Sequence, residues 1–288
     1  MHLQVLSSGS KGNATLVRAG ETSLLVDAGL TLRELERRFE AARFSARGLD
    51  HIALSHGHLD HARSSGALSR RTGATLHLCE RLMKNRSVAR AARMATLRID
   101  SATALAPKGT PAPARVGLGP DGSDAGPVAG LAGADGPGDA LELYATKIPH
   151  DADPTVAFRL DHGGRRAVIL TDMGEPRAVL GSRLGGAHVL VLEFNHDEAL
   201  LRGGPYPINL KRRVAGPGGH LSNAQAAEVL GHLAGPELHT LVLAHLSETN
   251  NHPDLALAAA HAKLDELGLA SVRVLVAAQD EVTEPLEV

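Results

Sequence analysis

The sequence predicts an α/β protein in which two β-sheets pack face to face between layers of helices. Apolar runs of strand length fall into two groups, one on each side of a segment rich in Gly, Pro, Ala and Asp. Helix-like segments separate strands in both groups, which indicates crossover connections. The 288 residues can form one large domain with a sizeable core, and we expect a single domain over residues 1–288.

The first group opens with three short apolar runs separated by Gly, Ser and Asn turns, which is typical of a strand meander. A helix follows, in which Thr31 can cap the first turn and Glu34 stands three residues further on, as in a capping box. After Gly48 the pattern alternates between strand and helix. We predict strands at 3–6, 14–18, 23–27, 51–55 and 74–78, and helices after 31, at 61–71 and from about 80.

The segment from about Pro107 to Gly138 has almost no large apolar side chain. It cannot bury enough surface to offset the entropy of ordering its backbone, so we expect a mobile surface insert. The second group of elements follows it. We predict strands at 141–147, 155–160, 166–171, 187–193, 240–244 and 271–276, and helices at 222–233 and 253–267.

Composition excludes several classes of protein. The chain has 30 Lys and Arg against 32 Asp and Glu, so it does not bind nucleic acid or membrane through overall basicity. The single cysteine, Cys79, rules out an intramolecular disulfide and fits a reducing compartment. The first residues show no secretory pattern and no run is apolar enough to span a bilayer, so we expect a cytoplasmic protein without a membrane partner. Oligomeric state has no signal in the sequence.

One count is abnormal, because the chain has 16 histidines while aromatic residues make up only 2%. Three of these histidines and one aspartate fall within Ser55–His61, directly after a predicted strand. A fixed pattern of this kind is expected about 0.003 times by chance in this length. Residues two apart on an extended segment point the same way, so His56 and His58 can face one cation, while Asp60 and His61 can reach a second.

Each ion needs further ligands, and three other predicted strands end in a suitable residue. These are His150 after 141–147, Asp172 after 166–171 and His245 after 240–244. A strand end is a rigid position from which a side chain can be aimed into a shared cleft.

These segments resemble, in type and in order, the five metal motifs of the metallo-β-lactamase fold hydrolases. The resemblance implies a four-layer αββα sandwich with two divalent metal ions, for which nitrogen and oxygen ligands suit Zn²⁺ or Mn²⁺. By the same resemblance His56, His58 and His150 would bind one ion, and Asp60, His61 and His245 the other. Asp172 would bridge the ions, and Asp27 would orient the histidine loop. Two such ions hold a water as hydroxide at neutral pH, so hydrolysis is the expected reaction.

Other segments bear on the substrate. The turn Ser7–Asn13 offers small residues, backbone N–H groups and an ammonium that together could cradle phosphate oxygens. Polar groups follow the strand at 187–193, and three adjacent cations at 211–213 could guide a polyanion. Ser222 can cap a helix whose positive end would attract an anion. The candidate substrate contacts are Ser8, Ser10, Lys11, Asn13, Asn195, Tyr206, Lys211, Arg212, Ser222 and Asn223.

Over nearly the whole chain outside the insert, these segments resemble the WalJ-type branch of bacterial exonucleases. The resemblance implies a nucleic acid substrate, DNA, with His196 and His220 near the substrate phosphate or acting as proton donors. Two residues depart from the pattern, Phe194 in place of a small polar residue and Thr249 in place of Glu, and either could alter substrate contacts. With few aromatic rings available, Tyr206 is the best candidate for stacking on a base.

The expected reaction is therefore attack on phosphorus by a metal-held hydroxide, with a histidine assisting the leaving group. An alternative keeps the two metals but cleaves a small carbonyl ester, lactone or thioester. Its signature would be a closed pocket with a cation for a carboxylate, whereas the cations at 211–213 and the loop Ser7–Asn13 favour a phosphodiester. A non-catalytic binding protein would lack a metal ligand, and none is missing.

Overall fold

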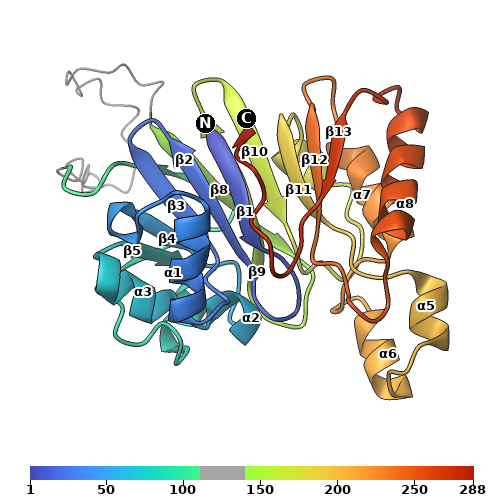
Figure 1. The fold of residues 1–288 in the computed structure, drawn as a ribbon, viewed down its shortest axis with the longest axis horizontal. Helices are drawn as coiled ribbons and strands as arrows, with labels where there is room; N and C mark the ends of the chain where they lie inside the picture. The colour runs from blue at the N-terminus through green and yellow to red at the C-terminus, as the bar shows by residue number, and fades with distance from the viewer. Residues whose placement is uncertain (111–139) are drawn as a thin grey trace, which may run out of the picture.

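The computed structural model describes residues 1–110 and 140–288, which form two seven-stranded sheets packed face to face with helices on both outer sides (Figure 1). The predicted fold class is therefore confirmed. The first sheet has the order β14-β1-β2-β3-β4-β5-β6 and the second the order β13-β12-β11-β10-β9-β8-β7. Apart from its first residues, 107–110, the predicted insert lies outside the described residues.

The first sheet and its helices come mainly from the first third of the chain. The strands pair antiparallel from β14 to β3 and parallel from β3 to β6. Its elements are β1 (His2–Ser7), β2 (Ala14–Ala19), β3 (Thr22–Val26), α1 (Leu32–Ala41), η1 (Ala46–Gly48), β4 (His51–Ala53), α2 (Leu59–Ala62), α3 (Ser65–Thr72), β5 (Thr75–Leu78), η2 (Glu80–Lys84), β6 (Arg93–Thr96) and β14 (Leu286–Glu287).

The second sheet is antiparallel from β7 to β10 and parallel from β10 to β13. Its elements are β7 (Ser101–Leu105), β8 (Leu141–Ile148), β9 (Thr155–His162), β10 (Arg165–Leu170), α4 (Leu180–Leu184), β11 (Val189–Glu193), α5 (Glu198–Gly203), α6 (Ile208–Val214), α7 (Asn223–Leu233), β12 (Thr240–Ala244), α8 (Pro253–Glu266) and β13 (Arg273–Val276). Within residues 1–110 and 140–288, no helix combines the length and apolar character needed to cross a membrane.

The central strands of the second sheet are buried on both faces. In β11, Val189 and Val191 pack in the core shared with the first sheet, while Leu190 and Leu192 pack in the core beneath α4, α7 and α8. The same alternation holds in β10 and β12. Because side chains of a strand alternate between faces, continuous apolar runs of this kind are what a sheet between two layers requires.

Helix caps agree with the sequence where a capping pattern was visible. Thr31 caps α1 by accepting from the Glu34 N–H at 3.3 Å, and Ser222 begins α7 in a complete capping box with Gln225. The helix predicted at 61–71 is wrong as one element, because Arg63 and Ser64 separate α2 from α3. The segment predicted as a helix from about 80 is the short 3₁₀ turn η2.

Several short elements were not predicted. Strands β6 and β7 are largely exposed and polar, so they lack the apolar pattern of a strand. Strand β14 has two residues and exists because Leu3 pairs with Leu286, which places the two chain ends side by side (Figure 1). Helices α5 and α6 extend from the lower end of the second sheet in Figure 1 and become important below.

Leu241 of β12 tests the core beneath the outer helices, since its side chain is fully buried. We expect Leu241→Ala to lower the free energy of unfolding by about 2–5 kcal/mol, from lost burial and the cavity left behind. Leu255→Ala is the matched control, because Leu255 of α8 is 41% exposed, and it should cost less than about 0.5 kcal/mol. Urea denaturation measures both, and equal losses would contradict this packing.

His51 and His77 form a buried pair on neighbouring strands, with 3.0 Å between His51 Nδ1 and His77 Nε2. Burial, together with the nearby His51, lowers the pKa of His77 to about 3. In the unfolded chain His77 binds a proton below about pH 6.5, whereas in the folded chain it stays neutral down to about pH 3. The contribution of neutral His77 to the free energy of unfolding is therefore fully present above pH 6.5 and falls as the pH drops towards 3.

Between pH 7 and pH 5 the unfolding free energy of the wild type should fall, and His77 should account for about 2 kcal/mol of that decrease. We therefore expect the decrease to be about 2 kcal/mol smaller in His77→Gln. Denaturation curves at the two pH values measure it. His261→Gln, at an exposed position of α8, should keep the wild-type dependence. A His77→Gln protein that loses as much stability as the wild type would refute the assignment.

Candidate metal centre

All seven predicted metal ligands meet at one edge of the sandwich, where β4, β8, β10 and β12 end. Within each of four groups, the candidate ligand atoms lie within 4.8 Å of one another. The groups are His56, His58 and His150; Asp60, His61 and His245; His56, His61 and Asp172; and Asp172, Glu193, His220 and His245. The first two groups are the two sets that the sequence resemblance implied.

The group of three histidines, His56, His58 and His150, is arranged to receive a cation. His150 Nδ1 lies 2.9 Å from the Gly219 carbonyl oxygen, and His56 Nδ1 lies 3.0 Å from Ser55 Oγ. These contacts leave Nε2 of each ring buried with no hydrogen-bond partner among the described residues. A buried polar atom without a partner is costly, and a divalent cation would remove that cost. The residues present therefore fit a metal ion.

Asp172 lies between the two groups. Its Oδ2 is 2.9 Å from His61 Nε2, and its Oδ1 is 3.7 Å from His245 Nε2 and 4.0 Å from His150 Nε2. Asp60 closes the second group, with Oδ2 3.8 Å from Nε2 of both His61 and His245. A carboxylate at the centre of two ligand sets has the position that a bridging ligand needs.

Asp27 fixes the loop that carries the histidines. Its Oδ1 accepts from the Ser55 N–H at 2.8 Å, and its Oδ2 lies 2.7 Å from His61 Nδ1. His61 Nδ1 therefore carries a hydrogen that it donates to Asp27, and the ring is oriented with Nε2 towards the centre. The backbone agrees, because the Asn13 N–H donates to the Asp60 carbonyl and the Ala28 N–H to the His61 carbonyl, both at 2.7 Å.

Three residues of the centre adopt a left-handed backbone, namely Asp27, Asp172 and His245, with φ of 62°, 62° and 56°. Each directly follows or closely follows a strand, so the chain turns sharply and carries the side chain to the sheet edge. Asp and His tolerate this conformation better than most residues. At Gly174 a Cβ atom would come within 2.1 Å of the Pro217 carbonyl oxygen, so glycine lets the loop before His220 pass against the Asp172 loop.

The sequence did not point to Glu193, the last residue of β11. Its fully buried Oε1 lies 2.8 Å from His220 Nδ1 and 3.2 Å from His245 Nδ1, while Oε2 accepts from the Met173 N–H at 2.9 Å. Burial alone would raise the pKa of Glu193, but the two histidines lower it to about 2. The available signal was a carboxylate at the end of a run of four apolar residues.

The carboxylates and histidines of the centre shift one another's pKa. Burial would raise the pKa of Asp60, but His245 and His61 lower it to about 2. Burial would lower the pKa of His245, but Asp172, Asp60 and Glu193 raise it to about 10. His56, which lacks such a close carboxylate, has its pKa lowered well below the usual value by burial and by His61. A divalent cation bound here would balance the carboxylate charge and displace protons from the histidines.

A cleft opens over the centre. It is lined by residues from the metal motifs and from four loops, among them Ser10, Asn195, Tyr206 and His220. Arg213 also lines it, and its guanidinium holds Asp151 Oδ2 at 2.7 Å through both Nε and Nη2. The sequence grouped Arg213 with Lys211 and Arg212 in a run of cations, but Arg213 was not among the predicted substrate contacts.

The other predicted substrate contacts divide into two sets. The first set contacts residues of the centre or stabilises neighbouring loops. Ser8 Oγ accepts from the His245 N–H at 2.8 Å, Asn13 Nδ2 lies 2.9 Å from His61 Nε2, and Asn223 pairs its side-chain amide with that of Asn251. Lys11 forms an ion pair at 2.7 Å with Glu248, which lines the cleft.

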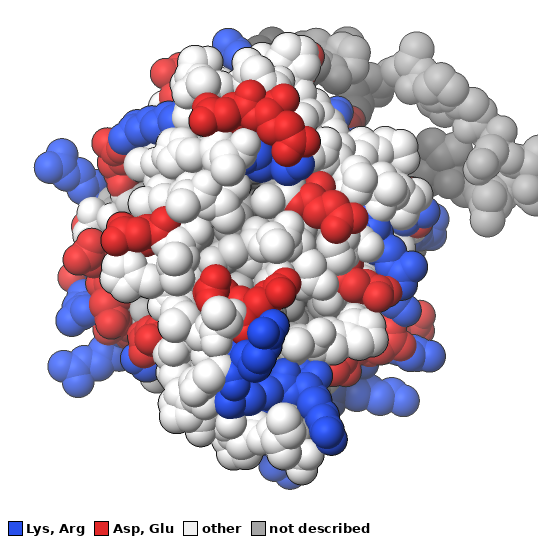
Figure 2. Space-filling model, turned by 90° about the vertical axis from the view of Figure 1, so that its right-hand side faces the viewer, with Lys and Arg blue, Asp and Glu red and all other residues white. Residues whose placement is uncertain are grey.

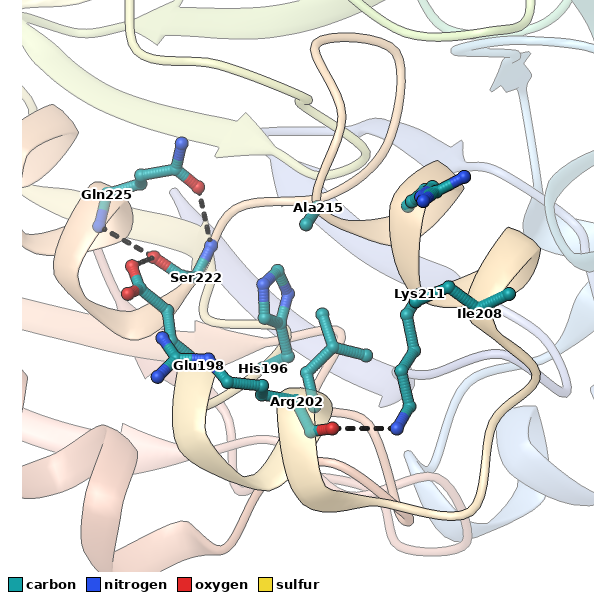
Figure 3. Close-up of a pocket in the computed structure, with 10 residues that line it drawn as sticks. His196, Glu198, Arg202, Ile208, Lys211, Ala215, Ser222 and Gln225 are labelled. Atoms are coloured by element: carbon teal, nitrogen blue, oxygen red, sulfur yellow. Dashed lines mark hydrogen bonds between the residues drawn. The ribbon is translucent and has the colours of Figure 1, made fainter.

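The second set lies across α6 from the cleft. His196, Lys211, Arg212 and Ser222 line a separate pocket formed by α5, α6 and the start of α7 (Figure 3). Of the two departures from the family pattern, Phe194 is fully buried beneath the outer helices, so its side chain does not reach the cleft. Thr249 does line the cleft.

Residues 22–246 match the model of the β-lactamase superfamily domain, so the chain belongs to that superfamily. Together with the fold and the centre, this match defines a metal-dependent hydrolase of the metallo-β-lactamase fold. Zn²⁺-bound PqqB from Methylobacterium extorquens has a similar structure, with a TM-score of 0.62 and 16% identity over 99% of this chain and 100% of that one.

Among individual proteins, the chain is 28% identical to exodeoxyribonuclease YycJ of Bacillus anthracis over 268 residues, 93% of this chain and 90% of the relative. It is also 28% identical to exodeoxyribonuclease WalJ of Streptococcus pneumoniae over 255 residues, 88% of this chain and 84% of the relative. The resemblance to the WalJ-type branch, predicted from the sequence motifs, is therefore confirmed.

Glu193 provides a test of the centre that does not remove a predicted ligand. We expect Glu193→Gln to weaken divalent metal binding about 10- to 100-fold, because the amide carries no charge and cannot accept from the two histidines and from the Met173 N–H at once. Titration of the metal-stripped protein with Zn²⁺ against a chelating indicator measures the affinity. Glu228→Gln, at an exposed position of α7, is the matched control and should bind as the wild type does. Unchanged binding by Glu193→Gln would contradict this role.

Proposed function

We propose that the chain is a phosphodiesterase that hydrolyses DNA as an exonuclease with two divalent metal ions, Zn²⁺ or Mn²⁺. The observation that carries the proposal is the arrangement of two ligand sets around Asp172 beneath a cleft with Arg213 in its wall. Two relatives that cover nearly the whole chain are named exodeoxyribonucleases, which supports DNA as the substrate.

In this proposal His56, His58 and His150 hold one ion, and Asp60, His61 and His245 hold the other, with Asp172 between them. The buried and unpartnered nitrogen atoms of His56, His150 and His245 support these assignments. Asp27 orients His61, and Glu193 orients His245 and His220. Two divalent ions supply a nucleophile from water at neutral pH and neutralise charge on phosphate oxygens.

The cleft suits a phosphodiester better than a small carbonyl compound. Arg213 stands in its wall with its guanidinium fixed by Asp151, and fixed arginines recognise phosphate well. Ser10 and Asn195 add polar groups, and Tyr206 offers a ring on which a base can stack.

His220 is the residue best placed to give a proton to the leaving oxygen. Burial would lower its pKa, but Glu193 and Asp172 raise it above the usual value, which favours the protonated ring. Nδ1 contacts Glu193, which leaves Nε2 as the nitrogen that can donate into the cleft. His196 lies outside the cleft lining, so we assign it no part in proton transfer.

The substrate is tested by loading the metal-stripped protein with Mn²⁺ or Zn²⁺ and adding end-labelled single- and double-stranded DNA and RNA. Release of mononucleotides from DNA ends supports the proposal. Internal fragments would indicate an endonuclease, and preferred cleavage of RNA would replace DNA as the substrate. Absence of cleavage, together with hydrolysis of an ester, lactone or thioester, would establish the carbonyl hydrolase instead.

The metal assignments predict the behaviour of two variants. We expect His58→Ala and Asp172→Ala, reloaded with metal, to hydrolyse bis(p-nitrophenyl) phosphate at least about 100-fold more slowly than the wild type, because the lost charge stabilisation is several kcal/mol. Elemental analysis should find about two ions per wild-type chain and fewer in each variant. His252→Ala, at the exposed start of α8, is the control and should keep wild-type activity and metal content. Wild-type rates in both ligand variants would make the assignment wrong.

A further inference from the structure

A second hollow lies across α6 from the metal cleft and has a volume of about 370 Å³ (Figure 3). This volume is at the lower end of the range for sites that take a small molecule. It suits a group of the size of one nucleotide rather than a duplex. The lining residues come from α5, α6 and the start of α7, and are His196, Glu198, Leu201, Arg202, Ile208, Lys211, Arg212, Ala215, Ser222 and Gln225.

Helix α6 is the wall that the two hollows share. Leu210, Arg213 and Val214 line the metal cleft, while Ile208, Lys211, Arg212 and Ala215 line the second hollow. These two sets have the spacing of two different faces of one helix. The linings of the two hollows are also close in the chain, since Asn195 of the metal cleft directly precedes His196 of the second hollow, and His220 lies two residues before Ser222. A nucleic acid strand that passes over α6 can therefore reach both hollows.

The rim of the second hollow is positively charged. It carries Arg202, Lys211 and Arg212, against a single carboxylate, Glu198, which accepts from Ser222 Oγ at 3.0 Å. Lys211 Nζ donates to the Arg202 carbonyl at 2.7 Å, and Arg212 forms no ion pair with any carboxylate of residues 1–110 and 140–288. Figure 2 shows Lys and Arg side chains gathered low on this face of the molecule, where α5 and α6 lie.

The interior is built for a flat group with polar edges. Leu201, Ile208 and Ala215 provide apolar walls, although Ile208 is 61% exposed in the absence of an occupant. His196 lies at the base, 2% exposed, and its Nδ1 is buried with no partner among the described residues (Figure 3). A buried nitrogen without a partner can be satisfied by an ordered water or by a ligand in the adjoining hollow.

We propose that this hollow binds one nucleotide of the substrate strand adjacent to the scissile bond. The base lies between the apolar walls with a polar edge towards His196, and its phosphate lies on the cations of the rim. The inference rests on the proposed function, because it assumes that the metal cleft acts on a nucleic acid. It adds that the enzyme distinguishes a strand from a dinucleotide through contacts made away from the metals.

Two variants test the hollow in different ways. Arg212→Gln removes one positive charge from the rim, and Ala215→Phe fills the interior without changing charge. Asn209→Asp is the matched control, because Asn209 lies on α6, is exposed and lines neither hollow, and the change in net charge equals that of Arg212→Gln. The measured quantity is kcat/KM of the metal-loaded protein for an eight-nucleotide DNA strand divided by that for a dinucleotide.

We expect both pocket variants to lower this ratio about tenfold, which corresponds to 1.4 kcal/mol, while Asn209→Asp leaves it within twofold of the wild type. Arg212→Gln should also reduce the slope of log kcat/KM for the strand against log salt concentration by about 0.7, since one phosphate contact is lost. Ala215→Phe should leave that slope unchanged. Thermal unfolding shows whether each variant is folded. If Ala215→Phe does not fold, the ratio measured for Arg212→Gln tests the proposal by itself.

Wild-type ratios in Arg212→Gln and in folded Ala215→Phe would overturn the proposal for this hollow while leaving the phosphodiesterase intact. An equal loss in Asn209→Asp would also overturn it, because net charge rather than the hollow would then be responsible. Failure of the proposed function has a different result, since the wild-type protein would then hydrolyse neither the strand nor the dinucleotide.

Discussion

Asp172 is buried with its two carboxylate oxygens facing imidazole nitrogens of His61, His245 and His150, and the site depends on how that charge is balanced. Ionised groups out of water need partners of opposite charge. Against the effect of burial, neighbouring carboxylates raise the pKa of His61 and His245, which favours the charged form of both rings. Divalent cations can supply the same balance and also satisfy the unpartnered ring nitrogens. Metal affinity and the burial of this cluster are thus two consequences of one arrangement.

The scaffold meets this constraint by bringing the ligands from rigid strand ends. Strands β4, β8, β10 and β12 belong to two different sheets, so the centre can form only when the sheets are packed against each other. Left-handed residues turn the chain at the ends of three strands, and Gly174 allows the loop that carries His220 to pass close to Asp172. The apolar cores on both faces of the second sheet fix β10, β11 and β12, and hence the positions of Asp172, Glu193 and His245.

Helices α5 and α6 have little part in the core. Their role is to form the walls of the hollows beside the metal centre. Alternate faces of α6 line the metal cleft and the second hollow, so the run of cations at 211–213 is divided between two environments. Arg213 is held by Asp151 above the metal ligands, whereas Lys211 and Arg212 lie beside the hollow that contains His196. One short helix therefore connects the centre with the surface along which a substrate strand would extend.

The sequence by itself determined the strands with long apolar runs, the capped helices and the seven candidate ligands, because apolar periodicity, capping residues and the spacing of His56, His58, Asp60 and His61 are local properties of the chain. It missed β6, β7 and β14, since short, exposed or two-residue strands carry no such pattern. Only the tertiary structure decided that Glu193 holds two histidines, that Ser8 and Asn13 contact the candidate ligands, and that Arg213 and Arg212 line different hollows beside α6. These are contacts between segments distant in the chain, and they arise from the packing of the two sheets and their loops rather than from any local sequence pattern.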